Sequence, residues 1–290
     1  MGGLGNQLFQ YAAARSLADK LGVELVLDGR YVVRKGHHTG LAIDCFNIRA
    51  RHIHPKEIRS FSEVKIRLAR WLKRLIRPVN NVFWETSLAF DGRMHSQGAG
   101  TMLVGFWQSQ RYINSNMEIR KDLQLCAPLG VGAATVAAQI ALQTSVALHV
   151  RRGDYLKDEK TMARYGLCSS GYYNKALDYV IDQVGDVKVF VFSDDPEWVK
   201  QHLNVPDDAC FVSAPSIIAE EDLVLISLCD HQIIANSTFS WWGAWLNLNH
   251  AKIVVAPQPW FDDTSIQAQD LIPDEWHQIN NDQPKFTAKI

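Results

Sequence analysis

The second half of the chain alternates short, mostly apolar runs with segments of helical spacing, and this alternation constrains the fold more than any other feature. Residues 145–150 and 187–192 are such runs, and residues 169–184 between them repeat apolar side chains every three to four positions. The alternation continues to residue 257. Strands that are apolar on both faces are typical of parallel sheets covered by helices on both sides. The sequence therefore predicts an α/β protein with a doubly wound parallel sheet from about residue 144.

The first half contains similar elements in a less regular order. Residues 6–22 have helical spacing, residues 23–28 favour a short strand, and residues 101–109 favour a strand that ends in aromatic side chains. A chain of 290 residues can hold two domains of ordinary size. We expect an N-terminal domain of residues 1–140 and a C-terminal domain of residues 141–290.

Composition and charge argue against several classes of protein. A net charge of −1 and a pI near 6.8 disfavour a general nucleic-acid binder, which is usually strongly basic. No apolar run reaches the roughly 18 residues of a membrane helix, and the glycine-rich opening does not resemble a signal peptide. The five cysteines are scattered without a CxxC pair, as in a protein whose thiols stay reduced. These features favour a cytoplasmic location.

Residues 65–77 carry six basic side chains and no acidic one, interleaved with apolar residues. A helix of this kind suits the surface of a membrane, which would place the protein peripherally at the inner face of the membrane. The alternative interpretation is a solvated basic face whose apolar side packs on the core.

Polar side chains follow three of the predicted strands of the second half. Residues 151–154 (Arg-Arg-Gly-Asp) follow one strand, residues 193–195 (Ser-Asp-Asp) follow the next, and residues 236–240 (Asn-Ser-Thr-Phe-Ser) follow a third. In open parallel sheets, ligands bind at the carboxyl ends of the strands. Arginine forks and the free N–H groups of a helix start bind phosphate oxygens, and a carboxylate that accepts two N–H bonds suits the edge of guanine. The three strand ends together predict a site for a nucleoside diphosphate.

Each of these features also has a purely structural interpretation. Ser237 is a suitable N-cap for the helix that follows, residues 194–195 suit a turn before a helix, and Arg152 can pair with Asp154. Residues 194–195 also resemble part of a metal site, but no further carboxylate or histidine at ligand spacing accompanies them, so we expect no metal. The coincidence of all three features at one edge of the sheet favours the binding site.

Four stretches of the sequence are specific enough to suggest a family. They are "GGLGNQLFQYA", "HVRRGDY", "FSDD" and "NSTFSWWGAWL". In this order they resemble the bacterial α-1,2-fucosyltransferases (galactoside 2-α-L-fucosyltransferases) of glycosyltransferase family 11, and the resemblance extends from residue 2 to about residue 261. It implies a GT-B-like architecture, in which two Rossmann-like domains with parallel sheets face each other across a cleft. In that architecture residues 1–140 form the acceptor side and residues 141–290 bind GDP-fucose.

The resemblance implies an inverting transfer of L-fucose from GDP-fucose to the 2-hydroxyl of a terminal galactose on an oligosaccharide acceptor. It implies no metal or other cofactor, and no nucleic acid as a partner. Two alternatives stay open: a GDP-fucose-dependent transferase with a different linkage or acceptor, and a non-catalytic relative that binds a nucleotide or glycan. The sequence indicates neither the individual acceptor nor the oligomeric state.

The resemblance also assigns roles to single residues. Arg151 resembles an arginine that holds the β-phosphate and the glycosidic oxygen, and Asn6 resembles an asparagine that faces the fucose and the acceptor. Asp154 is a third catalytic candidate, as a general base or as an ion-pair partner that orients Arg152, and the departing phosphate is another candidate base. Asp194 resembles the carboxylate that reads guanine. The predicted donor-binding residues are His149, Arg152, Ser193, Asp194, Asn236, Ser237, Thr238, Phe239 and Ser240. The predicted acceptor-side residues are Gly5, Gln7, Trp107 and Gln108.

The start of the chain departs from the family pattern. Family members carry a short strand before the glycine-rich turn, whereas Met1 directly precedes this turn here. A turn without that strand is less firmly anchored. The placement of Asn6, and the activity that depends on it, therefore stay open from the sequence.

Overall fold

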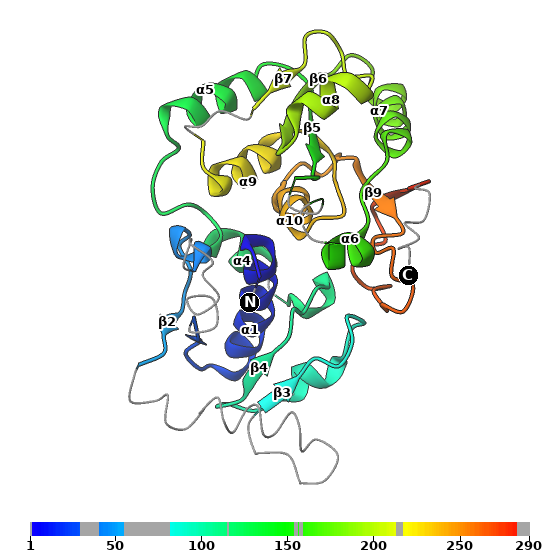
Figure 1. Ribbon diagram of the computed structural model, residues 1–290. Helices are drawn as coiled ribbons and strands as arrows, with labels where there is room; N and C mark the ends of the chain where they lie inside the picture. The colour runs from blue at the N-terminus through cyan, green and yellow to red at the C-terminus, as the bar shows by residue number, and fades with distance from the viewer. Residues whose placement is uncertain are drawn as a thin grey trace. The chain divides into compact units, whose positions relative to one another are not determined.

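The computed structural model describes residues 2–29, 41–54, 82–114, 116–153, 156, 159–212 and 217–282. The chain forms two compact units (Figure 1): the first unit comprises Met1–Cys126 and Gln269–Leu271, and the second comprises Ala127–Ala268 and Ile272–Ile290. The basic stretch 65–77 and Asp154 lie outside the described residues. No helix in the described ranges combines the length and the apolar character needed to cross a bilayer.

The second unit is built on a six-stranded sheet in which all neighbouring strands are parallel. The strand order is β10-β9-β8-β5-β6-β7. The strands are β5 (Ser145–Val150), β6 (Lys188–Ser193), β7 (Cys210–Phe211), β8 (His231–Ile233), β9 (Val254–Gln258) and β10 (His277–Asn280). The predicted α/β class with parallel sheets is confirmed.

Helices cover both faces of this sheet (Figure 1). Val146, Leu148 and Val150 of β5 pack with residues of α7 (Ser170–Val184) and α8 (Pro196–His202). Ala147 packs on the opposite face with residues of α5 (Val131–Ile140), α9 (Ala219–Leu228) and α10 (Thr238–Leu246). A further helix, α6 (Glu159–Tyr165), follows the turn after β5. β5 is buried along its whole length, because helices cover both faces of the sheet.

The strand order contains a topological switch point between β5 and β8. From β5 the chain proceeds outward through β6 and β7, and it then returns to β8 on the other side of β5 and proceeds through β9 and β10. This order is that of the Rossmann-like doubly wound fold, in which ligands bind outside the carboxyl ends of the strands at the switch point. The ends of β5 and β8 are therefore where a ligand is expected.

The first unit contains α1 (Leu4–Leu21), α4 (Asn116–Asp122) and two small parallel sheets. β1 (Val26–Leu27) pairs with β2 (Arg51–His52), and β3 (Val82–Trp84) pairs with β4 (Met102–Val104). Three short 3₁₀ helices complete the described elements, at Ala42–Cys45, Gly92–Ser96 and Gln110–Tyr112. Within the described ranges the first unit thus has parallel strands but no single large sheet. The facing arrangement of two domains stays a prediction of the family resemblance.

The division between the units differs from the sequence-based boundary at residues 140 and 141, because α5 belongs to the second unit. The backbone N–H of Gly130, the N-cap of α5, donates to Glu221 Oε1 of α9 at 2.6 Å. Ala133 and Ile140 are buried in the same core cluster as Ala147. The helical spacing of α5 identified the helix but carried no information about which core it joins.

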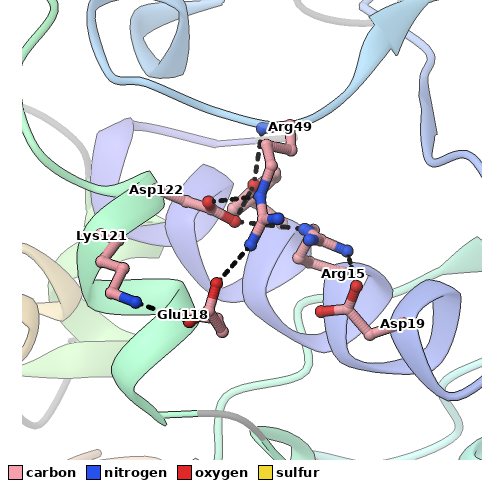
Figure 2. A network of polar contacts seen from close by, with 7 residues as sticks. Arg15, Asp19, Arg49, Glu118, Lys121 and Asp122 are labelled. Atoms are coloured by element: carbon pink, nitrogen blue, oxygen red, sulfur yellow. Dashed lines mark hydrogen bonds and ion pairs between the residues drawn. The ribbon is translucent and has the colours of Figure 1, made fainter.

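A buried carboxylate fastens α1 to its surroundings in the first unit (Figure 2). Asp122 at the end of α4 accepts hydrogen bonds from Tyr11 Oη at 2.7 Å, Arg15 Nε at 3.1 Å and Arg49 Nε at 2.9 Å. Arg49 also reaches Glu118 Oε2 at 2.7 Å. Burial and the bond to Asp122 raise the pKa of Tyr11 well above its ordinary value, so its hydroxyl stays a donor. The network fixes the helix whose first turn carries the glycine-rich motif.

Candidate functional site

The turn after β5 is held by the carboxylate that follows β6. Asp194 Oδ1 accepts from the backbone N–H of Arg152 at 2.9 Å, and Oδ2 accepts from that of Gly153 at 3.0 Å. Arg151 Nε lies 3.4 Å from the same Oδ2. The parallel register pairs Val150 with Ser193, so the residues after the two strands meet at one edge. The structure thus brings together two of the predicted strand ends.

The glycine of this turn is explained by the close approach of Asp194. A Cβ on Gly153 would lie 3.2 Å from Asp194 Oδ2 and 3.3 Å from its Cγ. A side chain there would push against the carboxylate that holds the turn. Both Asp194 oxygens accept N–H bonds from the protein, so they use part of the acceptor capacity that we assigned to guanine. The guanine contact of Asp194 stays a prediction.

Arg152 lies against α8. Its guanidinium lies 3.9 Å from the ring centroid of Trp198, and its Nε is 3.3 Å from Asp195 Oδ2. Asp195 is the N-cap of α8, because its Oδ1 accepts from the backbone N–H of Trp198 at 3.2 Å. Ser193 Oγ accepts from the backbone N–H of Asp195 at 3.0 Å. Ser193 and Asp195 therefore serve the start of α8, as the structural interpretation of this segment predicted.

The two adjacent arginines differ in exposure. The Arg151 side chain is 38% exposed, whereas that of Arg152 is 14% exposed. A long cationic side chain that keeps this much exposure at the switch point is available to an anionic ligand.

The third strand end, at the start of α10, combines capping with donor groups. Ser237 is the N-cap, and its Oγ accepts from the backbone N–H of Phe239 at 3.3 Å. Ser240 is buried and donates its hydroxyl to the carbonyl of Ser237 at 3.3 Å. Thr238 and Phe239 are half-buried. The start of a helix offers N–H groups and a positive dipole end to an anion, and Thr238 supplies the hydroxyl least committed to this cap.

His149 on β5 is a buried histidine with an unsatisfied ring nitrogen. It is 5% exposed, and its Nδ1 has no hydrogen-bond partner in the part of the chain that the structure describes. Its ring centroid is 5.7 Å from that of Phe239 at the start of α10. Burial, and secondarily the charge of Arg151, lower the pKa of His149 to about 3, so the ring is neutral. Buried polar groups without a partner are rare, and this one lies at the end of β5 beside the switch point.

Asn236 has a different position from the one we predicted. Its amide donates to the carbonyls of Tyr165 at 2.7 Å and Trp260 at 3.3 Å, and its Oδ1 accepts from the Cys168 thiol at 3.5 Å. The side chain is buried. Asn236 therefore links the end of α6, the segment between α6 and α7, and the segment after β9. It contributes to the site through the position of the α10 start.

Three of the predicted acceptor-side residues, Gly5, Gln7 and Gln108, lie in or contact the start of α1. Gln108 Nε2 donates to Asn6 Oδ1 at 2.6 Å, which joins the end of β4 to the first turn of α1. Gln7 donates to the carbonyl of Gly2 at 3.2 Å and accepts from the backbone N–H of Ile43 at 3.4 Å. Gly2 has a φ of +77°, and a Cβ there would lie 2.5 Å from Asn6 Nδ2. The glycine-rich turn thus wraps around Asn6 and Gln7, with Gly5 buried in the first turn of α1.

Trp107, which we predicted on the acceptor side, is a core residue of the first unit. It is 1% exposed and packs against Phe83 and Tyr112, with ring centroids 5.9 and 5.5 Å apart. Its φ of 59° is held by Glu85, whose carboxylate accepts the backbone N–H groups of Phe106 at 2.7 Å and Trp107 at 2.8 Å. Burial raises the pKa of Glu85. The strained turn directs Gln108, rather than the indole, toward Asn6.

Sequence reasoning missed Trp198 and Glu85. Trp198 was hidden in a short helix pattern, although Pro196 and Asp195 marked the start of that helix. The available signal was the alternation along β5, which continues into the arginines and places Arg152 on the face that α8 covers. Glu85 lies far in sequence from the turn that it holds, and no local pattern identifies it. Within the described ranges no three His, Cys, Asp or Glu side chains come together as metal ligands, and metal independence stays a prediction.

The strand order and the polar edge define a Rossmann-like α/β unit, a class of fold that binds nucleotides at its switch point. A model of glycosyl transferase family 11 matches residues 1–280. An α-1,2-colitosyltransferase of Escherichia coli is 32% identical over 96% of this chain and 96% of that protein. The galactoside 2-α-L-fucosyltransferase SEC1 of Bos taurus is 26% identical over 84% of this chain and 62% of that protein. The chain belongs to glycosyl transferase family 11, as its motifs predicted, and it is a glycosyltransferase of that family.

A solved structure also matches this chain. The fucosyltransferase NodZ from Bradyrhizobium has a TM-score of 0.48 and 16% sequence identity, and the match covers 83% of this chain and 89% of that chain. The site described above rests on the geometry of this chain alone.

Proposed function

We propose that this protein is an inverting glycosyltransferase that moves L-fucose from GDP-fucose to the 2-hydroxyl of a terminal galactoside in a glycan. The observation that carries the proposal is the turn after β5. Asp194 holds this turn at the switch point, where Arg151 keeps 38% exposure beside the neutral His149. The second unit binds the donor in this proposal, and the first unit supplies the acceptor side through Asn6 and Gln108.

Cleavage of the sugar–phosphate bond builds negative charge on the departing GDP. Arg151 and the N–H groups at the start of α10 are cationic or dipolar groups that stabilise this charge as it develops, which is commonly the largest contribution to catalysis. They replace the divalent cation that other transferases use, so the proposed reaction needs no metal. The acceptor hydroxyl must lose a proton. Asp154 and the departing phosphate remain the two candidates for the base, because Asp154 lies outside the described residues.

The similarity to an α-1,2-colitosyltransferase supports a second candidate donor sugar. Colitose is the 3-deoxy form of fucose, so the two sugars differ by one hydroxyl. A site that hydrogen-bonds this hydroxyl would reject colitose strongly, whereas a site without such a partner would accept both sugars. The name of the similar bovine protein supports fucose and a galactoside acceptor.

The first experiment is calorimetric binding of GDP, UDP, ADP and CDP in EDTA. We expect selective binding of GDP, followed by transfer from GDP-fucose to galactose-terminated oligosaccharides with an α-1,2 linkage in the product. Transfer with another linkage would support the first alternative. Selective GDP binding without transfer to any acceptor would support a non-catalytic relative. The absence of GDP binding in a folded sample would overturn the proposed site, and strict dependence on Mg²⁺ or Mn²⁺ would overturn the metal-free mechanism.

We also propose a cytoplasmic location with peripheral contact to the membrane through residues 65–77. The basic and apolar composition of this stretch supports the proposal. Sedimentation with vesicles should depend on anionic lipid and should weaken with salt. A protein that stays in the supernatant with anionic vesicles at low salt would contradict it.

A further inference from the structure

We infer that the two adjacent arginines have different tasks: Arg151 binds the diphosphate of the donor, and Arg152 is a positioning residue that Trp198 and Asp195 hold against α8. The inference rests on the proposed function and deepens it. It also makes Trp198 a positioning residue, which acts through Arg152.

The alternation of side chains along β5 separates the two arginines. Val146, Leu148 and Val150 face α7 and α8, whereas Ala147 faces α9 and α10, and His149 lies beside Phe239 of α10. Successive residues of an extended chain point to opposite faces. Continued past residue 150, this alternation places Arg151 on the α10 face with His149 and Arg152 on the α8 face.

The observed contacts agree with this separation. Arg152 lies 3.9 Å from the centroid of Trp198, and its Nε is 3.3 Å from Asp195 Oδ2. Its side chain is mostly buried by these partners. The charge of Arg151, in contrast, contributes to lowering the pKa of His149, as expected of a guanidinium on the same face. Only Arg151 is therefore on the face where the α10 start offers its N–H groups.

The anchoring of Arg152 determines where Arg151 points. Between the two side chains the backbone has one fixed point, because Asp194 accepts the N–H groups of Arg152 and Gly153. The Arg152 side chain on Trp198 adds a second fixed point on the α8 side. With both points held, the backbone at Arg151 is restrained, and Asp194 Oδ2, 3.4 Å from Arg151 Nε, restrains the guanidinium itself. Preorganised charge is what the departing diphosphate requires.

This division of tasks makes a specific kinetic prediction. Loss of the Arg152 anchor leaves the groups that contact the donor in place, so ground-state binding changes little. It loosens the aim of Arg151 at charge that develops only in the transition state, so kcat falls. A direct phosphate ligand would instead contribute to binding of the intact donor and would change KM.

The test uses substitutions on α8 in the full chain, with GDP-fucose as donor. We expect Trp198→Leu to lower kcat about tenfold, in line with the strength of a partly buried cation–π contact, with the donor KM changed less than twofold. Trp198→Phe keeps an aromatic face and should restore kcat to within about threefold of the natural protein. His202→Ala is the matched control, because the His202 ring stacks on Trp198 with ring centroids 5.0 Å apart but makes no contact with Arg152 within the described residues. Thermal unfolding of each variant identifies losses due to misfolding.

A double variant tests whether Trp198 and Arg152 act through the same contact. We expect Arg152→Met to lower kcat at least as much as Trp198→Leu, because it also removes the ion pair with Asp195. Arg152→Met/Trp198→Leu should lower kcat no further than Arg152→Met alone, because Trp198 acts only through Arg152. Additive losses, a raised donor KM with unchanged kcat, or unchanged kinetics in Trp198→Leu would overturn the inference. If the natural protein itself neither binds GDP nor transfers fucose, the proposed function fails first, and the assignment of Arg151 falls with it.

Discussion

Each unit of this protein contains two arginines grouped around aspartates, and the two groups are built differently. In the first unit, Arg15 and Arg49 both bond to Asp122, at 3.1 and 2.9 Å, and the Asp122 side chain is 4% exposed (Figure 2). In the second unit, Arg151 and Arg152 each have their own aspartate at 3.4 and 3.3 Å, and these carboxylates are 25% and 33% exposed. The residue types are the same, but the shared carboxylate of the first, closed group is buried, although Arg49 is itself 53% exposed. Both carboxylates of the second, open group are partly exposed.

The difference separates a structural network from a binding site. Asp122 Oδ2 accepts hydrogen bonds from Tyr11 and Arg15 of α1, and Oδ1 accepts one from Arg49. Little capacity for further hydrogen bonds to a ligand is left. The longer ion pairs of the second unit leave Arg151 accessible at a switch point. Removal of a charge from the first group should therefore lower the stability of the protein. Removal of the Arg151 charge from the second group should lower its activity.

The largest expected effect is that of Arg151→Ala. It should lower kcat/KM for GDP-fucose about a thousandfold, because it removes a charged donor from the leaving group. Its free energy of unfolding should stay within about 1 kcal/mol of the natural value, since this ion pair is exposed. Initial rates and urea unfolding on the same sample test both halves of the statement. A folded variant with near-normal rates would remove Arg151 from the mechanism.

Asp122→Ala should have the opposite profile. It leaves the buried guanidinium of Arg15 and the hydroxyl of Tyr11 without their shared acceptor, which should lower the free energy of unfolding by about 3 kcal/mol. Glu118→Gln is the matched control, because its pair with Arg49 is largely exposed and should contribute little to the free energy of unfolding. Urea unfolding measures both. Equal stabilities of the two variants would mean that the buried Asp122 contributes no more to the fold than an exposed ion pair does.

The strand pattern predicted the sheet and its polar edge, because apolar runs and the residues after them are local features. The division of tasks between Arg151 and Arg152 was implicit in the alternation along β5, but only the position of Trp198 shows what lies on each face. The structural roles of Asn236 and Trp107 could not be predicted from the sequence. Their positions depend on carbonyls and a carboxylate from distant segments, and a polar or aromatic residue at a strand end has the same local pattern in either role.

The Asp122 network could not be predicted from the sequence either, because its members are far apart along the chain. Its members come from α1, the segment after Cys45 and the end of α4, and their spacing has no periodicity. Charged residues on helices are usually solvated, so Arg15 and Asp122 gave no sign of burial. The predicted boundary near residue 140 differs from the division after Cys126, because the contacts of α5 with α9 are tertiary.

The open group should also respond to acid through His149. Its pKa of about 3 lies below the ordinary value of 6.5, so the unfolded chain binds the proton more readily between these two values. The contribution of His149 is therefore complete above about pH 6.5 and declines as the pH falls toward 3, by about 1 kcal/mol per pH unit. Urea unfolding at pH 7, 5.5 and 4.5 should show a shallower decline in His149→Gln than in the natural protein. His277→Gln, at an exposed histidine, is the control, and identical slopes in all three proteins would contradict the burial argument.

The smallest effect concerns the cap of α10, and it distinguishes capping from ligand binding at one atom. Ser237→Ala should cost about 1 kcal/mol of unfolding free energy, because Phe239 loses its N-cap acceptor. Ser237→Asp should recover that stability, since aspartate caps as well as serine and favours the positive helix end. The same carboxylate would repel a diphosphate, so GDP affinity should fall about tenfold while the fold is restored. Ser169→Asp makes the equivalent change at the cap of α7, where Ser169 Oγ accepts from Tyr172 N–H at 3.0 Å, and should leave GDP binding unchanged. Undiminished GDP affinity in Ser237→Asp would show that Ser237 only caps α10 and that the start of this helix does not bind the diphosphate.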